Sequence, residues 1–205
     1  YFMYQKPKTA KRLHWDVIPR AVDEYHQQLR AYPGQDIAAQ LANPVYHIHR
    51  GQVPQSTLGV SFAMLLNLAS VSGAEDKAVL WRYITRHVQG VTPASHPDLD
   101  AAAGFAVAYY NTHVKPAKNY RLPTDQERAA MHDLLARFRA HDGVAEGEEL
   151  QAIVYAVGKE HGFENLRDWF KALYEVLLGA SDGPRFGAFA ALYGLPETIA
   201  LIEAA

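Results

Sequence analysis

Residues 124–138 read TDQERAAMHDLLARF, which is the pattern of an α-helix with a defined start. Thr124 and Glu127 predict a capping box, in which each side chain accepts a hydrogen bond from a free amide at the helix N-terminus. Four apolar side chains follow at offsets 0, 3, 4 and 7: Met131, Leu134, Leu135 and Phe138. Because this spacing puts them on one face, the stretch predicts an amphipathic helix packed against a core.

Helical spacing continues in both directions from this stretch. We expect further helices over residues 16–32, 36–42, 58–71, 75–88, 98–114, 150–157, 166–177 and 196–205. Residues 44–57 contain two prolines and a glycine and are expected to form an extended loop, and 179–187 a turn-rich link. No longer segment alternates apolar and polar residues as a half-buried strand does. The sequence therefore predicts an all-α bundle or cage of about eight helices in two packed subdomains.

The composition excludes several classes of protein. The 205 residues are 49% hydrophobic and 20% charged, and no apolar run approaches the length of a membrane span. The absence of cysteine excludes a disulfide framework, a zinc finger and a cysteine nucleophile. A net charge of −2 argues against indiscriminate binding to nucleic acid. We expect a soluble cytoplasmic protein that binds neither a membrane nor DNA.

Charge is distributed unevenly along the chain. Residues 1–123 hold 13 basic and 8 acidic side chains, whereas residues 124–205 hold 7 basic and 14 acidic ones. We therefore predict a basic helical subdomain, 1–123, and an acidic one, 124–205. This asymmetry favours a polyanionic partner on one face, with a solvated helix surface as the alternative. If the partner is RNA, we expect the acidic face to point away from it.

No catalytic constellation is present among the motifs. The sequence lacks a Gly-x-Ser-x-Gly elbow, a P-loop and a G-x-G-x-x-G pattern. His47 and His49 could share a metal ion, but no third ligand accompanies them, so we predict no metal site. In the loop 183–187, Gly-Pro-Arg-Phe-Gly, Arg185 could act as a bidentate donor to a ligand, with a helix–helix corner as the alternative.

Several segments together resemble the class I lysyl-tRNA synthetases. They are YQKPKTAKRL at 4–13, DVIPRAVDEY at 16–25, LLNLA at 65–69, EDK at 75–77, YYN at 109–111, VKPA at 114–117, LRDWFKALY at 166–174 and GPRFG at 183–187. The resemblance covers the whole chain in one order. It implies the helical, anticodon-binding part of such an enzyme, with residues near the start as a remnant of the stem-contact connection.

The resemblance also implies how the whole enzyme would work. It would attach lysine to its tRNA through a lysyl-adenylate, using ATP with Mg²⁺. The ATP-binding motifs of the family, H-I-G-H and KMSKS, do not occur in this sequence. Since the chain opens on Tyr1 without a methionine, we expect a piece of a longer protein, inactive alone and without a cofactor of its own. Its expected partners are lysine tRNA and the catalytic domain of the same parent chain.

Candidate tRNA contacts come from basic and aromatic side chains. Cations neutralise phosphates and aromatic rings stack on unpaired bases. We predict phosphate contacts from Lys6, Lys8, Lys11, Arg12, Lys115, Lys118 and Arg121. For the anticodon bases we predict Arg185, with Phe186 or Trp169 as stacking partners. Trp169 also lies on the apolar stripe of its helix, where a core role is the alternative.

Three other functions stay open at this point. The chain could be a helical protein–protein interaction module that binds no RNA. It could be a small metalloenzyme that uses His47 and His49. It could also belong to another class I synthetase with a helical anticodon domain, such as the glutamyl type, although residues 4–12 and 16–25 favour the lysyl type.

Overall fold

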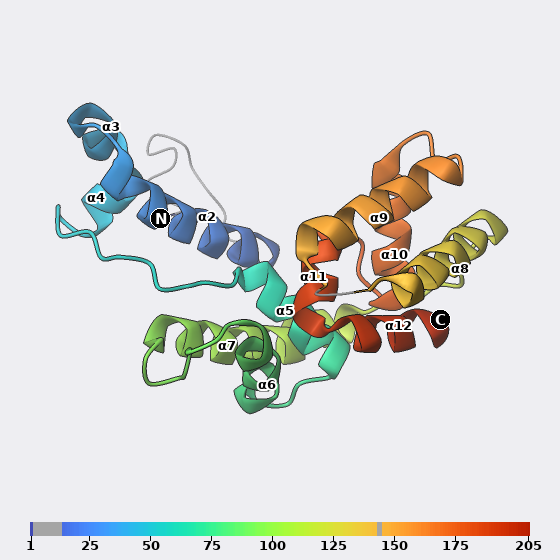
Figure 1. Cartoon of the computed structure of the whole chain (residues 1–205). Helices are drawn as coiled ribbons and strands as arrows, with labels where there is room; N and C mark the ends of the chain where they lie inside the picture. Colours follow the sequence, from blue (N-terminus) through green and yellow to red (C-terminus); the bar gives the residue numbers. More distant parts are fainter. Residues whose placement is uncertain (2–13, 143–144) are drawn as a thin grey trace.

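The computed structural model describes residue 1, residues 14–142 and residues 145–205. Within these residues the chain forms helices and no strand (Figure 1), which confirms the all-α prediction. The α-helices are α2 (Ile18–Ala31), α3 (Ile37–Ala42), α4 (Pro44–Ile48), α5 (Phe62–Ser72), α6 (Lys77–His87), α7 (Pro97–Tyr109), α8 (Asp125–Ala140), α9 (Gly147–Glu160), α10 (Leu166–Leu177), α11 (Phe186–Tyr193) and α12 (Leu195–Glu203). Figure 1 shows α2–α4 on one side, α8–α12 on the other, and α5–α7 between them.

Short polar side chains cap the starts of several of these helices. Thr124 and Glu127 form the predicted capping box at α8. Asn165 accepts a hydrogen bond from the amide of Arg167 at the start of α10. Asp76 does the same at α6, where it accepts from the amides of residues 78 and 79.

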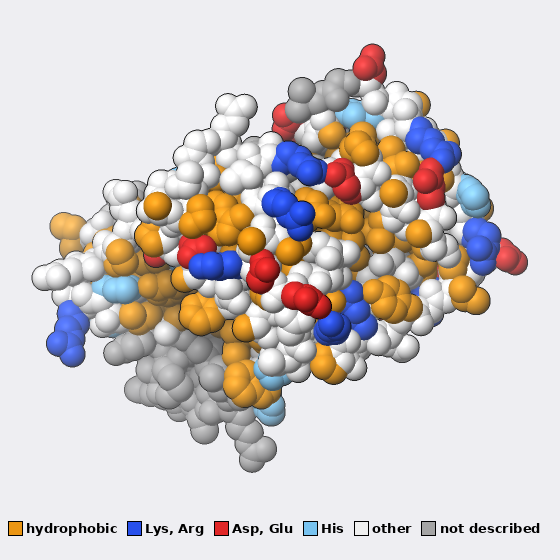
Figure 2. Space-filling model, turned by 90° about the horizontal axis from the view of Figure 1, so that it is seen from below, with side chains coloured by type: hydrophobic (Ala, Val, Ile, Leu, Met, Phe, Trp, Pro, Cys, Tyr) orange, Lys and Arg blue, Asp and Glu red, His pale blue; other side chains and the backbone are white. Residues whose placement is uncertain are grey.

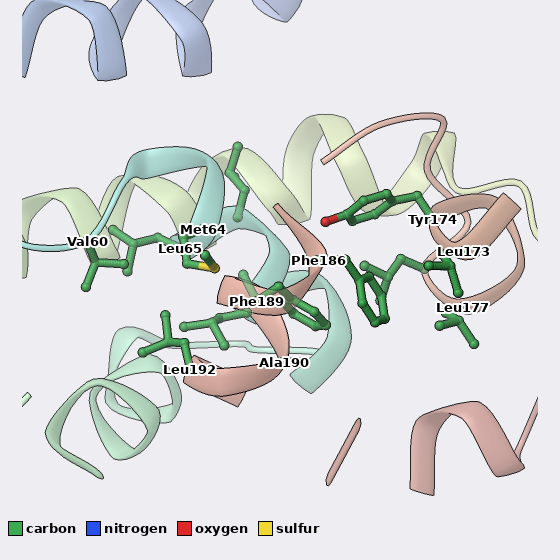
Figure 3. Packing of buried hydrophobic residues seen from close by; sticks show 14 of the residues in the cluster. Val60, Met64, Leu65, Leu173, Tyr174, Leu177, Phe186, Phe189, Ala190 and Leu192 are labelled. Carbon is green, nitrogen blue, oxygen red and sulfur yellow. The ribbon is translucent and has the colours of Figure 1, made fainter. Parts of the chain in front are cut away.

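Helix α5 lies at the centre because its side chains are apolar almost all round. It packs against α2, α6, α7 and α11. One hydrophobic cluster contains Leu65 of α5 together with Phe189 of α11 (Figure 3). The core therefore runs on across the predicted boundary between residues 123 and 124. The division into a basic and an acidic subdomain stays a prediction.

Three local expectations were wrong. Residues 44–48 are helical, because Pro44 occupies the first turn and the Asn43 side chain caps the amide of Val45. The helix expected over 98–114 ends at Tyr109 and continues as a π-helical segment, η3 (Tyr110–Val114), and a 3-10 turn, η4 (Lys115–Ala117). A further helix, α11, begins within the expected link at Phe186. Its run is apolar all round and gives no 3.6-residue period to detect.

Gly187 explains the position of α11. A Cβ at residue 187 would meet the backbone of Gln151 and the carbonyl of Gly147, both on α9. The glycine thus lets the two helices approach closely, and this contact brings the loop before α11 against α9.

In the part of the chain that is described, no single helix is long and apolar enough to cross a membrane. Helices α11 and α12 reach that length and composition only as a pair, and the chain bends by 109° between them.

Candidate nucleic-acid interface

A hollow of about 420 Å³ opens between α9, α10 and the loop that precedes α11. Its lining joins α9 and α10 residues with the loop: Gln151, Tyr155, Arg167, Asp168, Phe170, Lys171, Tyr174 and residues 181–185. We call it the α9–α10 hollow. It contains Arg185, which the sequence predicts as a contact to the anticodon bases, together with residues that no sequence motif marks as a site.

An aromatic pair forms one wall of the hollow. Tyr155 is 40% exposed and meets Phe170 edge to face, with ring centroids 5.1 Å apart. The exposed Tyr155 ring, which is inclined at 77° to the half-buried Phe170 ring, offers an aromatic surface on which an unstacked base can lie.

Three cations surround this wall and differ in their partners. Arg167 has no ion pair within the described residues. Lys171 lies 3.5 Å from Glu175. Arg185 holds Glu148 through two parallel bonds, Nη1 to Oε1 at 2.6 Å and Nη2 to Oε2 at 3.1 Å. The hollow therefore offers one unpaired guanidinium and two cations that already have carboxylate partners.

A buried frame fixes the backbone on both sides of Arg185. The Tyr174 hydroxyl donates to the carbonyl of Pro184, and the amide of Gly187 donates to Oε1 of Gln151 at 2.8 Å. Burial, followed by the charge of Asp182, raises the pKa of Tyr174, so its hydroxyl keeps the proton that it donates. Since both anchors are buried, the loop presents Arg185 from a defined position.

Two buried polar atoms lie near this frame. The Nδ2 of Asn67 has no hydrogen-bond partner within the described chain, and neither has Oγ of Ser70. A Cβ at Gly183 would first clash with the ring of Tyr174 and would also lie 2.8 Å from the Asn67 Nδ2, so the loop passes directly over both side chains. Glycine is therefore required at 183 for steric reasons.

Two of the predicted phosphate contacts are engaged in holding the structure together. Lys118 donates to the Ser70 carbonyl at 2.8 Å and to the Tyr120 hydroxyl at 3.0 Å. Arg121 binds Glu127 through two bonds of 2.7 Å and Glu175 through one of 2.6 Å. The positive charges of Lys118 and Arg121 are therefore directed toward other groups of the protein.

The pKa directions agree with this description of the Arg121 network. Hydrogen bonds to Glu127 and then Glu175 raise the pKa of Arg121. Hydrogen bonds from Arg121 lower the pKa of both carboxyls, and the Thr124 amide lowers that of Glu127 further. Lys115, by contrast, is exposed at the start of η4.

The stacking roles predicted for Phe186 and Trp169 are wrong for this structure. Both side chains are fully buried. Trp169 Nε1 donates to the Val154 carbonyl at 3.0 Å, and Phe186 packs between Tyr174 and Phe189 (Figure 3). A base has no access to either ring, because each lies on the apolar face that joins its helix to the core.

Other predicted residues lie elsewhere or outside the described chain. Lys6, Lys8, Lys11 and Arg12 fall outside the described residues. His49 Nε2 lies 2.7 Å from the Tyr25 hydroxyl, and His47 Nε2 lies 2.9 Å from the Leu41 carbonyl. Among the described residues, no three His, Cys, Asp or Glu side chains gather as a metal site would require.

Acidic side chains share the hollow with the basic ones, which counts against the expectation that an acidic face points away from a bound RNA. Asp168 and Asp182 line the hollow together with its three cations. Figure 2 shows the same mixture on one face of the molecule, where basic and acidic side chains lie next to each other. In the hollow and on the face seen in Figure 2, the charge excess of each half of the sequence therefore does not appear as a separate patch of one sign.

Four further residues line the hollow although no sequence motif selects them as candidates: Tyr155, Arg167, Phe170 and Lys171. For Tyr155 a signal existed, since this aromatic side chain falls off the stripe formed by residues 150, 153, 154 and 157 of its helix. For Arg167 and Lys171 the spacing of four puts both on one face of α10. Only the fold shows that the side of α9 with Tyr155 and the face of α10 with Arg167 and Lys171 meet.

Comparison with known proteins assigns the chain to a family. Residues 1–52 match the model of the class I (K) tRNA synthetases. Over all 205 residues the chain is 63% identical to a lysine–tRNA ligase of Roseobacter denitrificans, and over 204 residues 46% identical to that of Rickettsia felis and 47% to that of Rickettsia bellii. These alignments cover 98–100% of this chain but 39% of each relative. The chain thus spans about two fifths of its curated relatives, and it belongs to the class I lysyl-tRNA synthetase family.

Proposed function

We propose that this chain binds tRNA as part of a class I lysine–tRNA ligase and holds the anticodon arm of lysine tRNA in the α9–α10 hollow. The observation that carries the proposal is the hollow itself, where an exposed aromatic pair adjoins three cations. The rings provide a surface for an unpaired base, and the cations contact the phosphates on either side of it. Stacking of this kind contributes about 1–3 kcal/mol per base.

The site is suited to a single-stranded loop and poorly suited to a duplex. Its volume of about 420 Å³ accommodates a base that has left its stack, whereas a helical stem would meet Asp168 and Asp182 at the rim. Since sequence-specific RNA recognition uses splayed bases of loops, an anticodon loop fits this chemistry.

Not every predicted cation takes part in this proposal. Lys115 and Arg185 remain proposed phosphate or base contacts, and Arg167 and Lys171 join them. Lys118 and Arg121 act by holding the 118–121 segment against α5, α8 and α10.

The aminoacylation of tRNA with lysine, and with it the use of ATP and Mg²⁺, is proposed for the whole enzyme. The residues of this chain do not fit a nucleotide site, because its sequence contains no glycine-rich phosphate loop and neither ATP-binding motif of the family. The steps left to this chain are to bind and to orient the tRNA.

Binding of the chain to a lysine tRNA transcript, and to one with a changed anticodon, tests the proposal across a salt series. We expect tighter binding to the native anticodon and a log–log salt slope of roughly −0.7 per phosphate contact. Equal binding to the two transcripts would contradict anticodon recognition. Failure to bind either would favour the interaction module instead.

A pair of variants locates the site. Arg167→Gln removes the unpaired guanidinium of the hollow, whereas Arg82→Gln removes an exposed arginine of α6 that lies outside it. We expect weaker tRNA binding and a shallower salt slope for the first variant only. Equal losses would show that positive charge matters without regard to place.

A further inference from the structure

The pairing of Arg185 with Glu148 has a geometry that a phosphate could replace. A guanidinium that holds both oxygens of a carboxylate presents the same planar fork that it offers to two phosphate oxygens. The two carboxylate oxygens of Glu148 therefore occupy the positions at Arg185 that two phosphate oxygens of an RNA would need. It lies outside the lining of the α9–α10 hollow and reaches Arg185 from the first turn of α9.

This pair is placed so that it can open. The side chains of Arg185 and Glu148 are 59% and 80% exposed. An exposed ion pair contributes little to stability, since water solvates both partners when they separate. The charge of Glu148 is also stabilised when Arg185 is not bound to it, because a carboxylate in the first turn of a helix lies near the positive end of that helix. The loop backbone does not move in such an exchange, as the Tyr174 and Gln151 anchors are buried.

We propose that Glu148 is a built-in competitor that sets the affinity and selectivity of the hollow by holding Arg185 until an RNA phosphate displaces it. This inference rests on the proposed function. A free anion has to displace Glu148 by itself, against a carboxylate that is already tethered beside Arg185. An RNA that is already held by the aromatic wall and Arg167 presents its phosphate to Arg185 at a high effective concentration and therefore displaces Glu148. Glu148 thus selects anchored RNA over isolated phosphate groups.

The test compares two neighbouring variants of the same charge. Glu148→Gln releases Arg185, whereas Glu149→Gln removes an equal charge one residue away, from a side chain 4.0 Å from His141 that is not bonded to Arg185. We expect Glu148→Gln to tighten binding of lysine tRNA by about threefold at low salt, and Glu149→Gln to have a clearly smaller effect. Equal gains would show a general charge effect and would overturn the inference.

A double-mutant cycle with Arg185→Gln isolates the exchange itself. In the Arg185→Gln background, Glu148→Gln should no longer tighten tRNA binding, because Glu148 then has no arginine with which to pair. A gain that survives the loss of Arg185 would overturn the inference while leaving tRNA binding intact.

A competition assay with inorganic phosphate, at constant ionic strength, addresses selectivity. The Glu148→Gln variant should lose tRNA at a lower phosphate concentration than the wild type does. Equal sensitivity of the two proteins would contradict selection against free anions. If no variant and no wild-type protein binds RNA, the proposed function fails, and this inference fails with it.

Discussion

Replacing Glu127 by glutamine tests whether the Arg121 network stabilises the fold. Glu127 accepts two hydrogen bonds from Arg121 and one from the Thr124 amide, and its side chain is 12% exposed. Glutamine can still accept from the Thr124 amide, so the capping interaction survives. Its NH₂ group, however, replaces Oε1 and faces Nη2 of Arg121, so that bond is lost. The bond from Nη1 goes to the oxygen that also accepts from Thr124, and it loses the carboxylate charge.

The size of the effect follows from the exposure of the pair. Two bonds to a charged group would contribute about 1.5–3 kcal/mol each if they were fully buried. The Arg121 side chain is 36% exposed and keeps Glu175 as a partner, so solvent offsets much of this loss. We therefore expect Glu127→Gln to lower the free energy of unfolding by about 1–2 kcal/mol at pH 7.

The dependence on pH has a defined sign. Hydrogen bonds from Arg121 lower the pKa of Glu127 below its ordinary value of 4.5. A carboxyl with a lowered pKa in the folded state stabilises that state above its unfolded pKa and loses this contribution as the pH falls through the folded value. The difference between wild type and Glu127→Gln should therefore be constant near neutrality and shrink below about pH 4.5.

Urea unfolding followed by circular dichroism at a series of pH values measures this difference. Glu175→Gln is the matched control, since it also removes a carboxylate from Arg121 but leaves the capping box untouched; its effect should be the smaller one. Equal stability of Glu127→Gln and wild type at pH 7 would refute the reasoning. So would a difference that persists unchanged at pH 3, because the ionised carboxylate would then not be its source.

Three other variants probe the frame of the hollow. Gly187→Ala forces a Cβ into the backbone of α9 and should lower the free energy of unfolding by about 1–3 kcal/mol, which urea titration measures. Trp169→Phe removes the indole donor to the Val154 carbonyl, which stays bonded within α9, and puts a smaller ring in the core. It should lower the free energy of unfolding by about 1–3 kcal/mol, yet tRNA affinity of the folded protein should not change because the ring is buried. Tyr174→Phe removes the donor to the Pro184 carbonyl; it should raise amide hydrogen exchange in the 180–185 loop and weaken tRNA binding, and unchanged exchange would contradict the anchoring role.

The sequence predicted those helices whose cap and apolar period coincide. At α8 and α10, the capping residue and the stripe identify the same start and the same buried face. At α4 and α11 one of the two signals is missing. The first is only five residues long and is started by Asn43, and the second is apolar on every side. A pattern without polar residues contains no information about which side chains point inward, and this is why Phe186 was assigned to a site rather than to the core.

The composition of the candidate site was harder to predict because its contacts join distant parts of the chain. Arg121 finds Glu127 across the turn before α8, but its second partner, Glu175, is 54 residues away. Arg185 and Glu148 are 37 residues apart. No local spacing rule connects such pairs, so basic side chains that look available in the sequence prove to be already paired in the fold.

The mixture of charges at the α9–α10 hollow changes how affinity for RNA should arise. A surface with one sign of charge attracts a polyanion from a distance, and its binding falls steeply with salt. In the hollow, Asp168 and Asp182 accompany Arg167, Lys171 and Arg185, and Glu148 pairs with Arg185 from outside the lining, so little net field extends into solvent. Binding must then depend on contacts made at short range, on the aromatic wall and on an arginine that becomes available only by exchange. The acidic character of residues 124–205 is therefore compatible with RNA binding: it weakens attraction to any polyanion and leaves recognition to the geometry of the site.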